Sequence, residues 1–147
     1  MEKRINIQNL EPEAYKAMFG LEAYLVKTSI SKTIKELIKI RSSQINNCAY
    51  CINMHTKDAL ANGETQQRIF VLSAWREAPD LYTDQEKVAI EMTEEITLIQ
   101  HHGLCTETYQ KALQIFSENE VAQLIMAIVT INSWNRIAVS THLPLDE

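Results

Sequence analysis

Two thiols and one imidazole stand close together in the segment Cys48-Ala-Tyr-Cys51-Ile-Asn-Met-His55. In a helix, the Cα atoms of Cys48 and Cys51 would lie ~5 Å apart, within the ~4.4–6.8 Å range of disulfides. His55 follows Cys51 by four residues, so its imidazole can exchange a proton with that thiol directly or through water. The spacing predicts a thiol pair that can oxidise without unfolding, with a proton acceptor beside it.

A carboxylate stands where it can face this imidazole. If the chain reverses near Asn46, Glu36, ten residues before the turn, comes level with His55, nine residues after it. A carboxylate bonded to an imidazole fixes the tautomer and orientation of the ring. We therefore predict a hydrogen bond between Glu36 and His55.

The acidity of the thiols limits what the pair can do. A thiol of pKa ~8.5 is only about 3% thiolate at pH 7, and lowering that pKa by two units costs about 2.7 kcal/mol. A helix N-terminus supplies ~0.3–1 kcal/mol, so a second group must help. A cationic His55 would do so, whereas an ionised Glu36 suits a base or proton carrier. Cys48 lies nearest the helix start and Cys51 nearest the proton acceptor, which leaves the nucleophile open.

The elements that must position these residues are helices. Only three Gly and three Pro interrupt the chain, and apolar residues recur at intervals of three and four without a strand pattern. We predict an all-α bundle of six or seven helices that pack as one domain over residues 1–147. The first helix is expected to begin near residue 12. Five others are expected to span about residues 31–46, 48–61, 83–99, 106–116 and 117–139. One more helix, which carries residues 69–75, is expected to end before residue 79.

Charge and hydropathy exclude several classes of function. The 147 residues include 14 Lys and Arg against 19 Asp and Glu, a net charge of −5 without a basic run, so nucleic acid and membrane surfaces are poor partners. No segment has the length of a transmembrane helix or the pattern of a signal peptide, and we expect a cytoplasmic protein. Three cysteines in a reducing compartment favour redox or metal chemistry for the close pair, with Cys105 a bystander.

Together, the spaced Glu36, Cys48-x-x-Cys51 and His55 resemble the alkyl hydroperoxidase D-like core of the carboxymuconolactone decarboxylase family. The resemblance covers about residues 30–142. It is carried further by Arg41-Ser-Ser-Gln-Ile-Asn-Asn-Cys48, Met54-His-Thr-Lys57, Ala74-Trp-Arg-Glu77 and Asn132-Ser-Trp-Asn-Arg-Ile-Ala138.

The resemblance implies an all-α homo-oligomer, often a trimer or a pair of trimers, that acts as a thiol-dependent peroxidase or disulfide reductase without a further cofactor. By that analogy Cys51 attacks a hydroperoxide and becomes a sulfenic acid, Cys48 condenses with it, and a dithiol or lipoyl-type protein reduces the disulfide. Glu36 and His55 match the proton-relay positions of the family. Tyr50 departs from the family prototype, which has a histidine there, so a poorer proton shuttle is expected.

Other interpretations stand beside this one. Cys48, Cys51 and His55 could hold zinc, with Glu36 as a fourth ligand. A non-catalytic helical oligomer is a second alternative, and lactone decarboxylation a third, although the decarboxylase that gives the family its name lacks the Cys pair. We expect His101, His102 and His142 to be solvated, residues 124–129 to be core or subunit interface, and Asn132, Trp134 and Arg136 to pack or line a pocket without catalytic roles.

Overall fold

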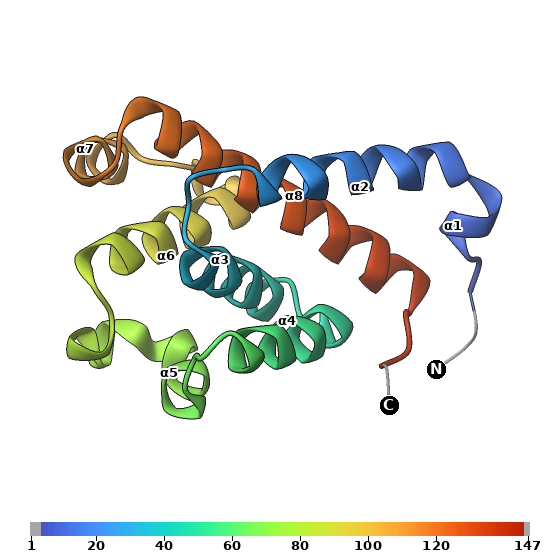
Figure 1. Ribbon diagram of the computed structural model, residues 1–147, viewed down its shortest axis with the longest axis horizontal. Helices are drawn as coiled ribbons and strands as arrows, with labels where there is room; N and C mark the ends of the chain where they lie inside the picture. The colour runs from blue at the N-terminus through green and yellow to red at the C-terminus, as the bar shows by residue number, and fades with distance from the viewer. Residues whose placement is uncertain (1–3, 146–147) are drawn as a thin grey trace.

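The computed structural model describes residues 4–145, and within them it is entirely helical (Figure 1). Eight α-helices and three short 3-10 helices follow one another without a strand in this part of the chain. They are α1 (Ile7–Leu10), α2 (Pro12–Val26), α3 (Lys32–Ile45), α4 (Ala49–Ala61), α5 (Gln66–Val71), η1 (Leu72–Glu77), η2 (Pro79–Leu81), α6 (Asp84–Thr97), η3 (Ile99–His101), α7 (Thr106–Ile115) and α8 (Glu118–Thr141).

Side-chain caps explain where the main helices begin. Capping boxes stand at two of the predicted helix starts: Thr83 with Glu86 opens α6, and Ser117 with Glu120 opens α8. At α3 the cap is Ser31, whose hydroxyl accepts a hydrogen bond from the backbone N–H of Ile34. The Glu36 carboxylate takes no part in that cap, so it is available to the site described below.

Two parts of the chain differ from the predicted helices. The turn α1 precedes the first predicted helix, which raises the α-helix count to eight. The helix predicted to run past residue 75 divides into α5, which ends at Val71, and η1, within which Ala74 (φ −119°, ψ 28°) lies outside the helical region. The break leaves Phe70 73% exposed while Trp75 is buried. There the indole N–H of Trp75 donates to Glu94, a tertiary contact that local periodicity does not encode.

The helix α3 lies in the middle of the molecule, against α4, α6 and α8 (Figure 1). Two apolar clusters form the core on either side of it, each fully buried aliphatic side chain contributing about 1.5–3 kcal/mol. One cluster lies mainly among α3, α6 and α8 and includes both Cys48 and Cys51. The predicted core role of residues 124–129 holds for Leu124, Ala127 and Ile128, whereas Val129 is 41% exposed.

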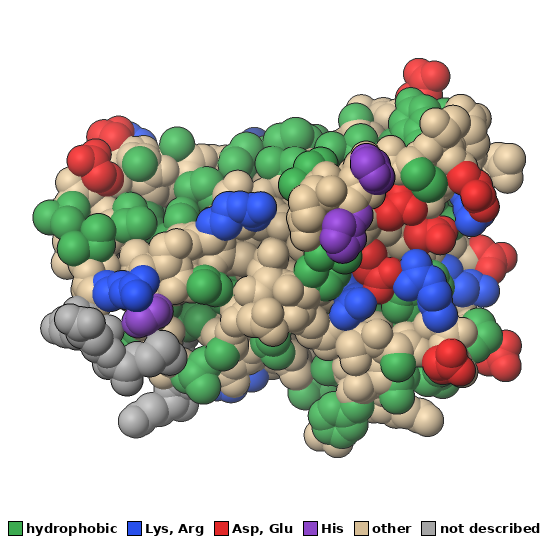
Figure 2. Space-filling view, turned by 180° about the vertical axis from the view of Figure 1, so that it is seen from behind, with side chains coloured by type: hydrophobic (Ala, Val, Ile, Leu, Met, Phe, Trp, Pro, Cys, Tyr) green, Lys and Arg blue, Asp and Glu red, His purple; other side chains and the backbone are tan. Residues whose placement is uncertain are grey.

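Charged side chains link the helices α3, α6 and η1. Glu94 of α6 accepts from Arg41 Nε of α3 at 2.8 Å and pairs with Arg76 of η1. Burial raises the pKa of Glu94, but these guanidinium groups outweigh that effect and hold it below the ordinary value. Figure 2 shows acidic and basic side chains interleaved at the right-hand end of the rear face.

Among the described residues, no helix has both the length and the apolar character needed to cross a membrane.

Candidate active site

A tight turn between α3 and α4 reverses the chain at the predicted place. Asn47 takes a left-handed conformation (φ +54°), and the backbone N–H of Cys48 donates to the carbonyl of Ser43 at 2.9 Å. The amide of Asn46 donates to Asn132 and Asn135 of α8, each at 2.9 Å. The turn is therefore held by the last helix as well as by its own backbone.

This turn presents two free thiols at the start of α4. Cys48 is the N-cap residue, and its sulfur accepts a hydrogen bond from the backbone N–H of Cys51. The two Sγ atoms lie 2.6 Å apart, and the residues are only 1% and 2% exposed. Since a disulfide bond measures about 2.05 Å, a small approach of the two sulfurs suffices to close one.

The two thiols differ in acidity. The hydrogen bond from Cys51 lowers the pKa of Cys48 to about 7; burial opposes this shift, while the Cys51 backbone N–H and the Asn135 amide support it. The same hydrogen bond, together with burial and the negative charge of Cys48, raises the pKa of Cys51. The pair therefore loses its first proton at Cys48, and the remaining proton lies on Cys51.

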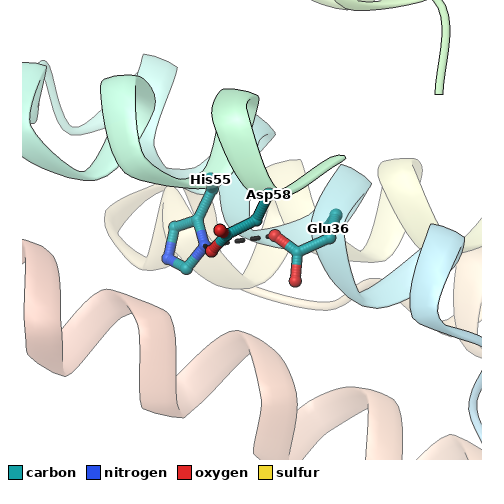
Figure 3. A group of neighbouring side chains, drawn as sticks. All are labelled: Glu36, His55 and Asp58. Atoms are coloured by element: carbon teal, nitrogen blue, oxygen red, sulfur yellow. Dashed lines mark hydrogen bonds and ion pairs between the residues drawn. The ribbon is translucent and has the colours of Figure 1, made fainter. Parts of the chain in front are cut away.

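Next to Cys51, the predicted contact between Glu36 and His55 is present. His55 Nδ1 lies 3.1 Å from Glu36 Oε2 and 4.0 Å from Asp58 Oδ2, and Figure 3 shows the ring beside both carboxylates. Burial raises the pKa of Glu36, but the hydrogen bond from His55 and the charge of Lys39 lower it further than burial raises it. An ionised Glu36 accepts the Nδ1 proton, which leaves Nε2 of His55 as a proton acceptor.

Cys51 and His55 open onto a cleft of about 300 Å³. Tyr15, Phe19 and Trp134 form its aromatic wall, with ring centroids 5.1–5.7 Å apart in edge-to-face and tilted arrangements. The indole N–H of Trp134 donates to Glu22 across the helices α8 and α2. Cys48 does not line this cleft. Cys51 therefore lines the cleft, whereas Cys48 is the thiol with the lowered pKa.

The zinc alternative is not supported by the geometry. Within residues 4–145, one group of at least three potential ligands has its donor atoms within 4.8 Å of one another: Glu36, His55 and Asp58. Neither cysteine belongs to it, so the set of Cys48, Cys51, His55 and Glu36 is not assembled. Asp58 is also 57% exposed, as carboxylates without a metal commonly are.

Several contributors were missed or misplaced by sequence reasoning. Tyr15 and Phe19, to which sequence reasoning gave no role in the site, form the cleft wall because α2 packs on α8. Asp58, three residues after His55, could have been found by its helical spacing, and Asn135 by its place beside Trp134. Cys105 is exposed, as are His101 and His102, in agreement with expectation. His142, expected to be solvated, is instead half-buried.

Comparison with known proteins agrees with the geometry. The model of the carboxymuconolactone decarboxylase family matches residues 12–95. The chain belongs to this family. An uncharacterized protein of Bacillus subtilis (strain 168), YdfG, is 44% identical over 140 residues, which cover 95% of each chain.

Solved structures resemble the whole fold. The crystal structure of ATU0492 from Agrobacterium tumefaciens, a protein of unknown function with a proposed role as antioxidant defence protein AhpD, is 36% identical. The match covers 99% of both chains with a TM-score of 0.94. The debrominase Bmp8 is 18% identical over 95% of this chain and 74% of its own, with a TM-score of 0.83, which shows a shared fold alone. The chain is an AhpD-like helical protein.

Proposed function

We propose that this protein is a thiol-dependent peroxidase that reduces organic hydroperoxides with the Cys48–Cys51 pair and is recycled by a dithiol donor. The observation that carries the proposal is the placement of two free thiols 2.6 Å apart. One of them, Cys51, lines a cleft together with His55, the hydrogen-bond partner of Glu36. The family includes enzymes named for decarboxylation, but a close thiol pair serves redox chemistry more directly.

The oxidative half-reaction begins with one proton already lost from the pair. That proton is held by His55, and the remaining proton is shared along the S–H···S hydrogen bond between Cys51 and Cys48. When it moves to Cys48, the Cys51 thiolate attacks the terminal oxygen of the hydroperoxide and breaks the O–O bond. His55 protonates the departing alkoxide, which leaves an alcohol and a Cys51 sulfenic acid.

Closure of the disulfide completes the oxidation. The Cys48 thiol attacks the sulfur of the Cys51 sulfenic acid, its proton joins the departing hydroxide, and water leaves. The net reaction converts two thiols and one hydroperoxide into one disulfide, one alcohol and one water. Because the two sulfurs are already adjacent, condensation requires little rearrangement of α4.

The Glu36 carboxylate and the His55 imidazole take different parts in the proton transfers. Glu36 accepts the Nδ1 proton of His55 and orients the ring, so that Nε2 serves the reacting groups directly or through a water in the cleft. Lys39, which pairs with Glu36 at 3.3 Å, keeps that carboxylate ionised. The aromatic wall supports an organic hydroperoxide as substrate, because its apolar group can pack on Phe19 and Trp134.

The test mixes reduced protein with one equivalent of cumene hydroperoxide and follows free thiols and intact mass over time. We expect rapid loss of two thiols and a mass decrease of two hydrogens. The Cys51→Ser variant is the control and should not react. Thiol loss no faster than that of free cysteine would overturn the proposal and favour a non-catalytic oligomer.

A further inference from the structure

We infer that the dithiol donor reduces the oxidised pair through a second cleft, at Cys48, with His142 as the group that handles its proton. This inference rests on the proposed function. The second cleft measures about 210 Å³ and is lined by Cys48 and His142 but not by Cys51. The two sulfurs therefore face two separate spaces.

The clefts meet at a common wall. Tyr50, Ala138 and Leu143 line both of them, whereas Cys51 lines only the aromatic cleft and Cys48 only the second. A disulfide between the two sulfurs would span this wall. The donor could then reach the disulfide from one side before the alcohol product has left the other.

His142 occupies a backbone position that does not favour histidine. It follows α8 in the left-handed conformation (φ +52°), and its backbone N–H caps the helix at Ala138 and Val139. Glycine and asparagine are the usual residues there, because other side chains are strained in that conformation. The cap uses only the backbone, so the imidazole is not needed for it.

One nitrogen of the imidazole is also left without a protein partner. Nδ1 of His142 is buried, and among residues 4–145 it has no hydrogen-bond partner. Buried polar atoms are nearly always hydrogen-bonded, and an exception calls for an explanation. A turn of the ring toward the cleft that His142 and Cys48 line would let a bound ligand supply the missing partner, and a thiol losing its proton is a suitable one.

The chemistry then balances in two steps. A donor thiol gives its proton to His142 and attacks Sγ of Cys48, the S–S bond breaks, and Cys51 leaves as a thiolate. The second donor thiol loses its proton to solvent and attacks the donor sulfur of the mixed disulfide, while His55 passes one proton from solvent to the Cys51 thiolate. Cys48 leaves as a thiolate and takes the first proton back from His142. The donor ends as a disulfide.

The size of the cleft restricts the donor. Because Cys48 is only 1% exposed, a thiol must enter the cleft to reach it. The donor must therefore carry its thiol on a group narrow enough to enter this space.

The experiment measures the two half-reactions separately. Protein oxidised by one equivalent of cumene hydroperoxide is mixed with dithiothreitol, and the return of free thiols is timed for wild type, His142→Gly and His142→Asn. We expect the ratio of reduction rate to oxidation rate to fall at least about tenfold in both variants. Both replacements suit the left-handed position, so thermal unfolding should show no loss of stability. Added imidazole should restore the reduction rate of His142→Gly.

A matched control comes from the chain itself. His102 also lies in the left-handed region (φ +76°) but is exposed and does not line either cleft, so His102→Gly should behave as wild type. Unchanged reduction in both His142 variants would overturn the inference. Slow reduction that imidazole does not restore would also overturn it, since it would show a structural effect. Failure of the wild-type protein to oxidise would instead overturn the proposed function.

Discussion

The two ends of the Cys48–Cys51 pair have different surroundings. Cys51 lies beside aromatic rings and the Glu36–His55 pair, whereas Cys48 sits at the N-cap of α4 beside His142. Cys48 has the lowered pKa and Cys51 the raised one. The side with the Glu36–His55 pair thus holds the less acidic thiol, and the more acidic thiol lines the second cleft.

This difference suits a pair that must react in two directions. In the proposed oxidation, the alkoxide that leaves on the Cys51 side needs a proton donor, which His55 provides. In reduction, the final step expels Cys48 from a mixed disulfide, and a thiol of low pKa leaves faster. A single environment for both sulfurs could not favour both steps, and the predictions below alter one side at a time.

The largest effect is expected from replacing each cysteine. Cys51→Ser should abolish reaction with cumene hydroperoxide, whereas Cys48→Ser should react once and stop at a Cys51 sulfenic acid, because no partner remains to condense with it. Intact mass would show a gain of one oxygen atom, and a sulfenic acid trap such as dimedone would label Cys51. Labelling of Cys48 in the Cys51→Ser variant would reverse the two roles.

A smaller loss is expected from the relay on the Cys51 side. His55→Gln should slow thiol oxidation about 10²-fold and Glu36→Gln somewhat less, because the first removes the proton donor to the departing alkoxide and the second only its orienting partner. Stopped-flow oxidation measures the rates, and circular dichroism checks that the helices persist. Asp58→Asn is the control, since Asp58 lies 4.0 Å from the ring and is largely exposed. An equal loss in all three variants would argue against a specific relay.

The aromatic wall should affect substrate choice more modestly. Phe19→Ala removes one ring of the wall, and we expect the preference for cumene hydroperoxide over hydrogen peroxide to fall about fivefold, the value of about 1 kcal/mol of lost contact. Phe19 is 53% exposed, so its replacement should not unfold the protein. Phe70→Ala is the matched control, as Phe70 is 73% exposed on α5 and outside the cleft. An unchanged preference would place the substrate elsewhere.

The sequence predicts those parts of the site that depend on residues close to one another along the chain. Counting residues through the turn at Asn46 placed Glu36 beside His55, and the Thr83 and Ser117 boxes located two helix starts, because each depends on nearby residues. Tertiary packing decided the rest. The aromatic wall joins Tyr15 to Trp134, 119 residues apart, and only the folded chain brings them together.

The pKa values of the two thiols and the cleft that each sulfur lines could not be predicted from the sequence either. The lowered pKa of Cys48 depends on its contact with Cys51 Sγ and on Asn135, a residue of α8 that reaches the turn only after folding. The N-cap position of Cys48 was expected, but helix-end effects alone were too weak to explain a shift of this size. His142 gave no periodic signal because its role depends on a cleft formed between α4 and the end of α8.

The smallest expected effect is a pH dependence specific to the Cys48 side. Because its pKa falls from 9.0 to about 7 on folding, the reduced protein should gain stability as pH rises from about 7 to 9 and lose that gain as pH returns through about 7. Alkylation by iodoacetamide should show an inflection near pH 7, and chemical unfolding should show the rise. Oxidised protein and Cys48→Ser lack this thiol and should show neither. An inflection near pH 9 in the reduced protein would mean that the hydrogen bond from Cys51 does not hold Cys48 as a thiolate. Cys48 would then not be the more acidic of the two thiols.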